Sequence, residues 1–167
     1  MRKYVAIIGI LLTVTILISG SAVAGTWHYA QEVEFEENCT DEDEILYEPN
    51  GSSASIGQSN PPVLGRILVD LGEDNYMGDN QNFTVFGGSL GIHNKEEYDV
   101  WVSEDSETID YEDYCGRGDD RENEEFWTPS DPEKEWRYIY IHAVSGHANG
   151  GGPAYGPDID AVGWYEP

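Results

Sequence analysis

The sequence contains very little positive charge. Its 167 residues include 8 lysines and arginines against 33 aspartates and glutamates, which gives a formal net charge of −25 at pH 7. Nucleic acids and anionic membrane surfaces are recognised through basic faces. The charge balance therefore argues strongly against either as a partner. It is typical of a heavily solvated surface, of a cation-rich exterior, or of a calcium-binding protein.

Long apolar runs are missing except at the N-terminus. Arg2 and Lys3 precede the uncharged stretch YVAIIGILLTVTILI, and Ala22-Val23-Ala24 fits the small-residue rule for signal cleavage. We therefore predict an export signal over residues 1–24. The alternative is an uncleaved membrane anchor, because the apolar stretch is long enough to span a bilayer. Both interpretations place residues 25–167 outside the cytoplasm, at the cell surface or beyond it.

Cysteine is also scarce. The chain has two cysteines, Cys39 and Cys115, and an isolated pair in an exported protein most simply forms one disulfide. Closing so long a loop is worth about 4 kcal/mol in the chain-entropy model. The competing interpretation is a two-cysteine metal site, but no suitably spaced histidine accompanies the pair. The sequence predicts a Cys39–Cys115 disulfide.

Residues 25–167 lack any apolar pattern with helical spacing. Short segments with strand character lie between loops rich in Gly, Asn, Asp and Pro. These segments are RILVDLG, NFTVFGG, EYDVWVSED, WRYIYIHAVSG and DIDAVGWYE, starting at residues 66, 82, 97, 136 and 158. Five Trp, eleven Tyr and four Phe argue against disorder. The sequence predicts an all-β sandwich with antiparallel strands.

We expect one domain with an acidic segment before it. Residues 25–44 alternate Val33 and Phe35 with glutamates and then become an acidic run. This pattern predicts an edge strand followed by a solvated linker. The β-sandwich domain is predicted over residues 45–167, with no internal repeat.

The order and spacing of five segments resemble a known family of extracellular modules. The segments are GRILVDLGE (65–73), GDNQNFTVFG (78–87), EYDVWVSED (97–105), RYIYI (137–141) and GPDIDAV (156–162). They are similar to motifs of discoidin-like, galactose-binding-like jelly rolls in archaeal and bacterial cell-surface proteins. The resemblance implies a jelly-roll β-sandwich and a non-catalytic binding module, with a glycan as the expected ligand. Asn82 and Ala143 stand where that family usually has acids, so we carry no ligand role over to them.

Two aspartates, Asp158 and Asp160, lie on the last predicted strand. Residues i and i+2 of a strand share a face, so both carboxylates can reach one cation. Calcium takes 6–8 oxygen ligands, and the resemblance implies a structural calcium near the terminal strands. Asp79 is a candidate third ligand. The alternative is that one aspartate accepts backbone N–H bonds from the loop at 145–157 while the other is solvated. Both interpretations stay open here.

Three aromatic residues on the alternating segments are candidates for a ligand-binding face. Trp101, Tyr138 and Tyr140 either stack on a sugar from a sheet face or fill the core. The sequence alone does not assign the face. Three N-x-S/T sequons, at Asn38, Asn50 and Asn82, are candidate glycosylation sites in an exported chain.

Two other functions compete with the binding module. A structural subunit of a cell-surface layer or filament is the alternative, because residues 25–44 could add as a strand to the sheet of a neighbouring surface protein. A hydrolase ranks last. The sequence shows no nucleophile motif, and glycosidases need two carboxylates ~5–9 Å apart across a sugar cleft.

Overall fold

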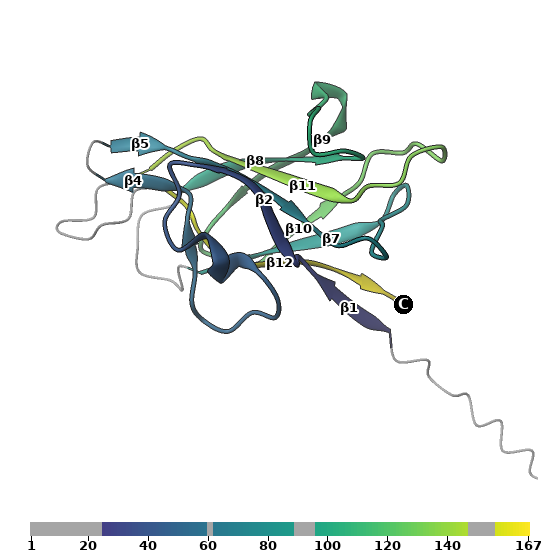
Figure 1. Ribbon diagram of the computed structural model, residues 1–167, viewed down its shortest axis with the longest axis horizontal. Helices are drawn as coiled ribbons and strands as arrows, with labels where there is room; N and C mark the ends of the chain where they lie inside the picture. The colour runs from purple at the N-terminus through teal and green to yellow at the C-terminus, as the bar shows by residue number, and fades with distance from the viewer. Residues whose placement is uncertain (1–24, 60–61, 89–95, 147–155) are drawn as a thin grey trace, which may run out of the picture.

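The computed structural model describes residues 25–59, 62–88, 96–146 and 156–167, and nearly all of its regular structure is β-strand (Figure 1). The predicted export signal, residues 1–24, lies outside the described residues. The strands are β1 (Thr26–Tyr29), β2 (Glu32–Glu37), β3 (Ala54–Ser55), β4 (Gly57–Ser59), β5 (Pro62–Leu64), β6 (Arg66–Asp70), β7 (Asn82–Gly87), β8 (Glu97–Ser103), β9 (Tyr114–Asp119), β10 (Glu124–Trp127), β11 (Tyr138–Ala143) and β12 (Asp158–Glu166). Two short 3₁₀ helices, η1 (Glu42–Ile45) and η2 (Tyr111–Asp113), complete the described elements. None of the helices in these ranges is long and apolar enough to cross a membrane.

The strands form two packed sheets. Sheet A has the order β1-β12-β7-β10, with β3 also paired to β12, and sheet B has the order β2-β6-β11-β8-β9. A small ribbon of β4 and β5 stands beside them. Every one of these pairings is antiparallel. The predicted all-β antiparallel sandwich is confirmed.

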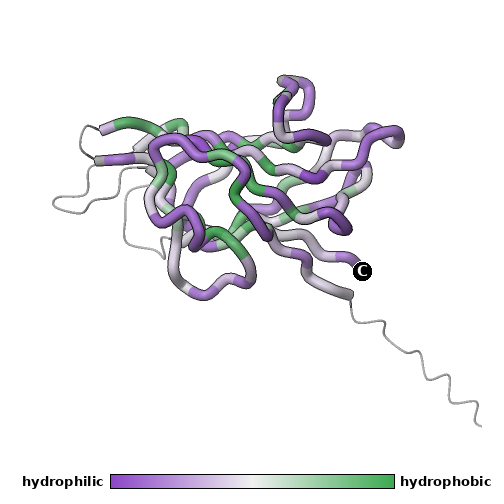
Figure 2. The backbone as a smooth tube through the Cα atoms, viewed as in Figure 1, coloured by the Kyte–Doolittle hydropathy of each residue, from purple (hydrophilic) through white to green (hydrophobic). Residues whose placement is uncertain are grey.

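Alternation along the strands decides which side chains enter the core. In β8, Val100 and Val102 are fully buried, and in β11 Ile139 and Ile141 are as well. These residues pack in one hydrophobic cluster that is shared between the two sheets. Because successive side chains of a strand point to opposite faces, their neighbours in sequence must point away from the core. Figure 2 shows that hydrophilic residues dominate the connecting segments, including the one that projects beside β9.

Residues 25–44 contribute a strand to each sheet. β1 pairs with β12, and β2 pairs with β6. The chain passes from sheet A to sheet B at Ala30, which is fully buried and whose N–H donates to Val162. The sandwich therefore begins before the boundary expected at residue 45. β1 and β2 thus each pair on one side within their own chain and lie at an edge of their sheet.

The predicted disulfide is wrong, because both cysteines are free. Cys39 follows β2 at one edge of sheet B, whereas Cys115 lies on β9 at the opposite edge. Four strand spacings separate these edges, or ~19 Å, and a disulfide needs Cα atoms about 4.4–6.8 Å apart. The Cys39 thiol contacts the carbonyl of Arg66 at 3.4 Å. Burial raises the pKa of each thiol to about 12, so both are protonated at neutral pH.

The separation of the two cysteines predicts that a reductant has no effect on stability. The melting temperature should be the same with and without dithiothreitol, because no covalent cross-link is lost. Differential scanning calorimetry measures this directly. A thiol titration of the unfolded protein should find two free thiols, and a melting temperature that falls on reduction would contradict the strand order.

Candidate functional site

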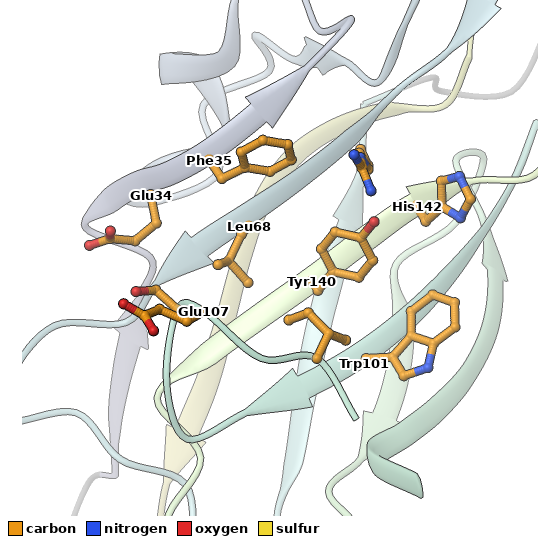
Figure 3. A pocket seen from close by; sticks show the side chains of 10 residues that line it. Glu34, Phe35, Leu68, Trp101, Glu107, Tyr140 and His142 are labelled. Atoms are coloured by element: carbon orange, nitrogen blue, oxygen red, sulfur yellow. The ribbon is translucent and has the colours of Figure 1, made fainter. Parts of the chain in front are cut away.

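A groove of about 630 Å³ lies on the outer face of sheet B (Figure 3). It falls in the size range of small-molecule sites. Strands β2, β6, β8 and β11 form its floor, and the loop that follows β8 forms one wall. The lining residues are Glu34, Phe35, Arg66, Leu68, Trp101, Ser106, Glu107, Ile109, Tyr140 and His142.

Aromatic rings make up much of the groove floor. Trp101 of β8 and Tyr140 of β11 are direct cross-strand partners, and their ring centroids lie 5.7 Å apart. His142 follows on the same face, 6.4 Å from Tyr140. These side chains point outward because the valines and isoleucines between them in sequence enter the core. The third candidate aromatic, Tyr138, is largely covered and lies under the Arg137 guanidinium.

Arg66 stands at the edge of the floor and is held from several sides. Its guanidinium lies 2.6 Å from a Glu37 oxygen and sits over the Phe35 ring at 5.2 Å. Hydrogen bonds to Tyr140 and to Glu37 raise the pKa of Arg66 further above its ordinary value. The cation is thus already paired and is placed as a hydrogen-bond donor beside the aromatic rings.

Asp99 holds a residue that packs against Trp101 of the groove floor. Its two carboxylate oxygens accept hydrogen bonds from Arg117, each at 2.8 Å, and one also accepts from the Tyr114 hydroxyl at 2.8 Å. The Arg117 contact is the main reason that the pKa of Asp99 is lowered. Tyr114 in turn packs on Trp101 with centroids 5.1 Å apart. The network therefore orients the Trp101 ring.

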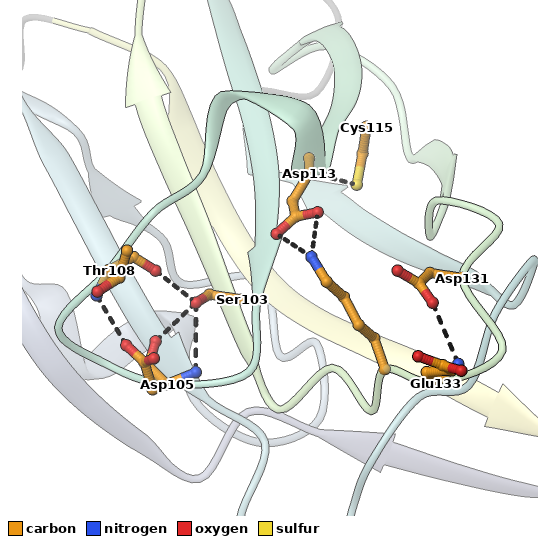
Figure 4. Close-up of polar contacts among 8 residues, drawn as sticks. Ser103, Asp105, Thr108, Asp113, Cys115, Asp131 and Glu133 are labelled. Carbon is orange, nitrogen blue, oxygen red and sulfur yellow. Dashed lines mark hydrogen bonds and ion pairs between the residues drawn. The ribbon is translucent and has the colours of Figure 1, made fainter.

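The loop wall is built around two side chains (Figure 4). The Ser103 hydroxyl lies 2.7 Å from the carbonyl oxygens of both Asp105 and Thr108. A carboxylate oxygen of Asp105 accepts from the N–H groups of Glu107 and Thr108, at 2.9 and 2.7 Å. Such Asx hydrogen bonds organise turns. They hold Ser106, Glu107 and Ile109 against the groove without a ligand.

Further along the chain, the segment that leads into β9 is tied down by an ion pair. The Lys134 ammonium lies 3.0 and 3.1 Å from the two Asp113 oxygens and over the Trp136 ring at 4.7 Å. Figure 4 shows Asp113 beside Cys115, whose thiol contacts the Asp113 carbonyl at 3.5 Å. η2 is therefore anchored to the sandwich.

Asp160 is almost buried, with 8% of its surface exposed. Its carboxylate accepts the backbone N–H groups of Asn50 at 3.0 Å and Gly51 at 3.1 Å. Asp160 thus has the loop-fixing role considered for the Asp158–Asp160 pair. The loop it fixes is the one before β3, however, and not the one that precedes its own strand.

Asp158 lies at the start of β12 beside another acid. Its backbone N–H donates to a carboxylate oxygen of Asp120 at 3.4 Å, and its carbonyl accepts from Gly88 at 2.8 Å. Asp120 is fully buried and also accepts from the Glu96 N–H at 3.2 Å. Burial raises the pKa of Asp120, and the nearby Asp158 charge contributes.

Asp79 lies at the other end of sheet A from Asp158. The residue after Asp158, Ile159, pairs with Gly87 at the end of β7, whereas Asp79 precedes the start of that strand. A six-residue strand separates them by ~17 Å. The three predicted calcium ligands Asp79, Asp158 and Asp160 therefore do not surround one ion.

One other group of carboxylates in the described ranges is close enough to hold a metal ion. Oxygens of Glu32, Glu34 and Asp70 lie within 4.8 Å of one another. Asp70, however, already accepts two hydrogen bonds from Arg137, at 2.7 and 2.5 Å, and one from the Gly72 N–H at 2.7 Å. Its charge is neutralised by the protein itself.

The three sequons differ in accessibility. Asn50 is exposed, Asn38 is half-buried, and Asn82 is the half-buried first residue of β7. Glycosylation at these sites stays a prediction, with Asn50 the most accessible acceptor.

Sequence reasoning named Trp101 and Tyr140 but missed most of the groove. Phe35 and Arg66 stand on strands that are far apart in sequence and become neighbours only when β2 pairs with β6. Glu107 and Ile109 come from a loop that the sequence indicates only as polar. The alternation of Ile139 and Ile141 with Tyr140 and His142 was the available signal, because an apolar inward set implies an outward face.

Comparisons with known proteins support the fold. No protein-family model and no curated protein matches the chain. Among solved structures, the C-terminal domain of a chitobiase from Bacteroides fragilis superposes with a TM-score of 0.51 at 12% identity, over 84% of this chain and 93% of that chain. The CBM32 of AlyQ in complex with 4,5-unsaturated mannuronic acid gives a TM-score of 0.47 at 14% identity, over 82% and 98%.

The similarity to the chitobiase domain concerns the fold alone. The predicted discoidin-like, galactose-binding-like jelly roll is confirmed as the architecture of this chain. The identities are too low for the neighbours to indicate which residues bind a ligand.

The Asp160 contacts predict a specific stability loss. Asp160→Ala leaves two backbone N–H groups without their acceptor, which should lower the free energy of unfolding by about 1–3 kcal/mol. Urea unfolding followed by tryptophan fluorescence measures the change. Asp79→Ala is the matched control, because Asp79 is exposed, and it should shift stability by less than about 0.5 kcal/mol. Equal losses in both variants would contradict the loop-fixing role.

Proposed function

We propose that this protein is a non-catalytic β-sandwich module that binds a carbohydrate in the groove on sheet B. The observation that carries the proposal is the composition of that groove. It joins the rings of Phe35, Trp101 and Tyr140 with the hydrogen-bonding groups of Arg66 and His142. A sugar ring has apolar C–H faces and a hydroxyl edge, so it needs an aromatic platform and polar groups at the same site.

Preorganisation of the groove supports binding. The Asp99 network orients Trp101, the Asp105 turn holds the loop wall, and the Glu37 pair holds Arg66. A ligand that enters a site of this kind orders few side chains, so less of its contact energy is lost to conformational entropy. This matters for sugars because each hydroxyl exchanges water contacts for protein contacts with little net gain.

The position of the groove carboxylates favours binding over hydrolysis. Glycosidases place two carboxyl groups on either side of the scissile bond. In Figure 3, Glu34 and Glu107 lie at the same end of the groove. In the Asp158–Asp160 pair, the Asp160 carboxylate already accepts the backbone N–H groups of Asn50 and Gly51. We therefore propose a module without catalytic activity.

We further propose that the module acts outside the cell. The predicted signal at residues 1–24, the acidic surface and the sequons support this location. The partner is then a glycan at or beyond the cell surface.

Removing the aromatic floor should abolish most of the binding. Trp101→Ala and Tyr140→Ala should each weaken glycan affinity about ten-fold or more, as expected for aromatic anchors at the centre of a site. Isothermal titration calorimetry against ligands found on a glycan array measures the change. Trp127→Ala is the matched control, because this residue is 58% exposed on sheet A and should leave affinity unchanged. A groove variant that binds as well as the native protein would overturn the proposed site.

Calcium stabilisation stays part of the proposal, in a narrower form. At one end of the sandwich the buried Asp120 carboxylate accepts backbone N–H groups of Asp158 and Glu96, and the charge of Asp158 lies close enough to raise the pKa of Asp120. A cation beside Asp120 and Asp158 would offset that repulsion and the cost of burying Asp120. EGTA should therefore lower the melting temperature. Asp158→Asn should remove this response, whereas Asp79→Asn at the opposite end should retain it. A melting temperature unaffected by EGTA in the native protein would end the calcium proposal and leave the sugar site untouched.

A further inference from the structure

Two carboxylates at one end of the groove suggest the chemical class of its ligand. We propose that the bound carbohydrate carries a protonated amine, as 2-amino sugars do. The ammonium group would lie between Glu34 and Glu107 while the sugar rings stack on the aromatic floor. This inference rests on the proposed function and concerns the same groove.

The two carboxylates come from different parts of the fold and meet at the groove. Glu34 is exposed on the outer face of β2, and Glu107 is exposed on the loop after β8. Figure 3 shows both side chains at the end of the groove away from Trp101 and His142. The backbone of Glu107 is fixed by its bond to Asp105 at 2.9 Å. The loop therefore holds Glu107 at the same end of the groove as Glu34.

The cations of the protein near the groove are already paired. Arg137 is bound by both oxygens of Asp70. Arg66, the cross-strand partner of His142 at the other end of the groove, is bound by Glu37. Within the described ranges, Glu34 and Glu107 take part in no ion pair with a lysine, arginine or histidine. Their negative charge is balanced only by solvent, and a ligand cation can complement it.

The surroundings add to the negative potential. Glu32 is exposed beside Glu34, with carboxylate oxygens within 4.8 Å, and the whole chain carries a formal charge of −25. A sugar acid would meet like charge at this end of the groove. An ammonium gains charge-assisted hydrogen bonds from the two carboxylates, and it is also favoured near aromatic faces. Charge complementarity thus selects an amino sugar over a uronic acid.

The test compares three short glycans of equal length by isothermal titration calorimetry with the purified protein. They are a β-linked glucosamine oligomer, its fully N-acetylated counterpart, and an oligouronate. We expect the glucosamine oligomer to bind at least about five-fold tighter than the acetylated one, since an ion pair of this kind contributes roughly 1 kcal/mol. The oligouronate should bind most weakly.

Variants then test whether Glu34 and Glu107 cause the preference for the glucosamine oligomer. The double substitution Glu34→Gln/Glu107→Gln should reduce glucosamine affinity to the level of the acetylated oligomer and leave the affinity for the acetylated oligomer within about two-fold. The matched control is Asp43→Asn/Glu44→Gln, which removes the same charge from an exposed acidic group outside the groove. This control should retain the preference for the amine.

Three results would overturn the inference, and they separate it from the proposed function. Equal or tighter binding of the acetylated oligomer, lost in Trp101→Ala, would refute the amine preference and uphold the sugar site. An equal loss of glucosamine affinity in the control variant would show general attraction to an acidic surface. Failure of all three glycans to bind would remove both the inference and the proposed function.

Discussion

The packing of the two sheets against each other is the constraint on which the rest of the molecule depends. Ile139 and Ile141 of β11 meet Val100 and Val102 of β8 in a single buried cluster. A strand has a period of two, so a slip by one residue would turn every inward side chain to solvent. The core therefore determines the register, and the register places Trp101 beside Tyr140 on the opposite face. The groove is a geometric consequence of the core.

Acidic side chains have two different roles in this structure. Some accept backbone N–H groups and hold loops, as Asp160 does for Asn50 and Gly51 and as Asp105 does for its own turn. Others neutralise the few cations, as Asp70 and Asp99 do for Arg137 and Arg117. Such bonds are worth more than neutral ones because the acceptor is charged. A large acidic surplus remains at the surface after both roles are filled, and part of it borders the groove.

Prediction from the sequence succeeded where local pattern and burial agree. The alternating segments at 97–105 and 136–146 correspond to β8 and β11, and DIDAVGWYE matches β12 residue for residue. The acidic start of the chain was harder to interpret. The alternation of Val33 and Phe35 with glutamates predicted an edge strand, and β2 is indeed an edge strand of sheet B. The additional edge strand β1 of sheet A was not predicted.

Pairs of residues that are distant in sequence were the least predictable feature. Two cysteines in a protein predicted to be exported suggested a disulfide. The number of cysteines, however, does not indicate which edge of a sheet each one occupies. The predicted calcium ligands Asp79, Asp158 and Asp160 illustrate the same point, because Asp79 and Asp158 flank opposite ends of β7. A period of two determines which face a residue occupies and leaves open which strand lies next to it.

The amino-acid sequence by itself therefore determined the all-β class and the strands of the core, since these follow from burial with a period of two. The tertiary structure alone decided that β2 lies beside β6, that the loop after β8 folds over the same face, and that Glu34, Arg66, Trp101 and Glu107 share one groove. The physical reason is that strand order depends on the packing of the whole chain, and no local pattern encodes it.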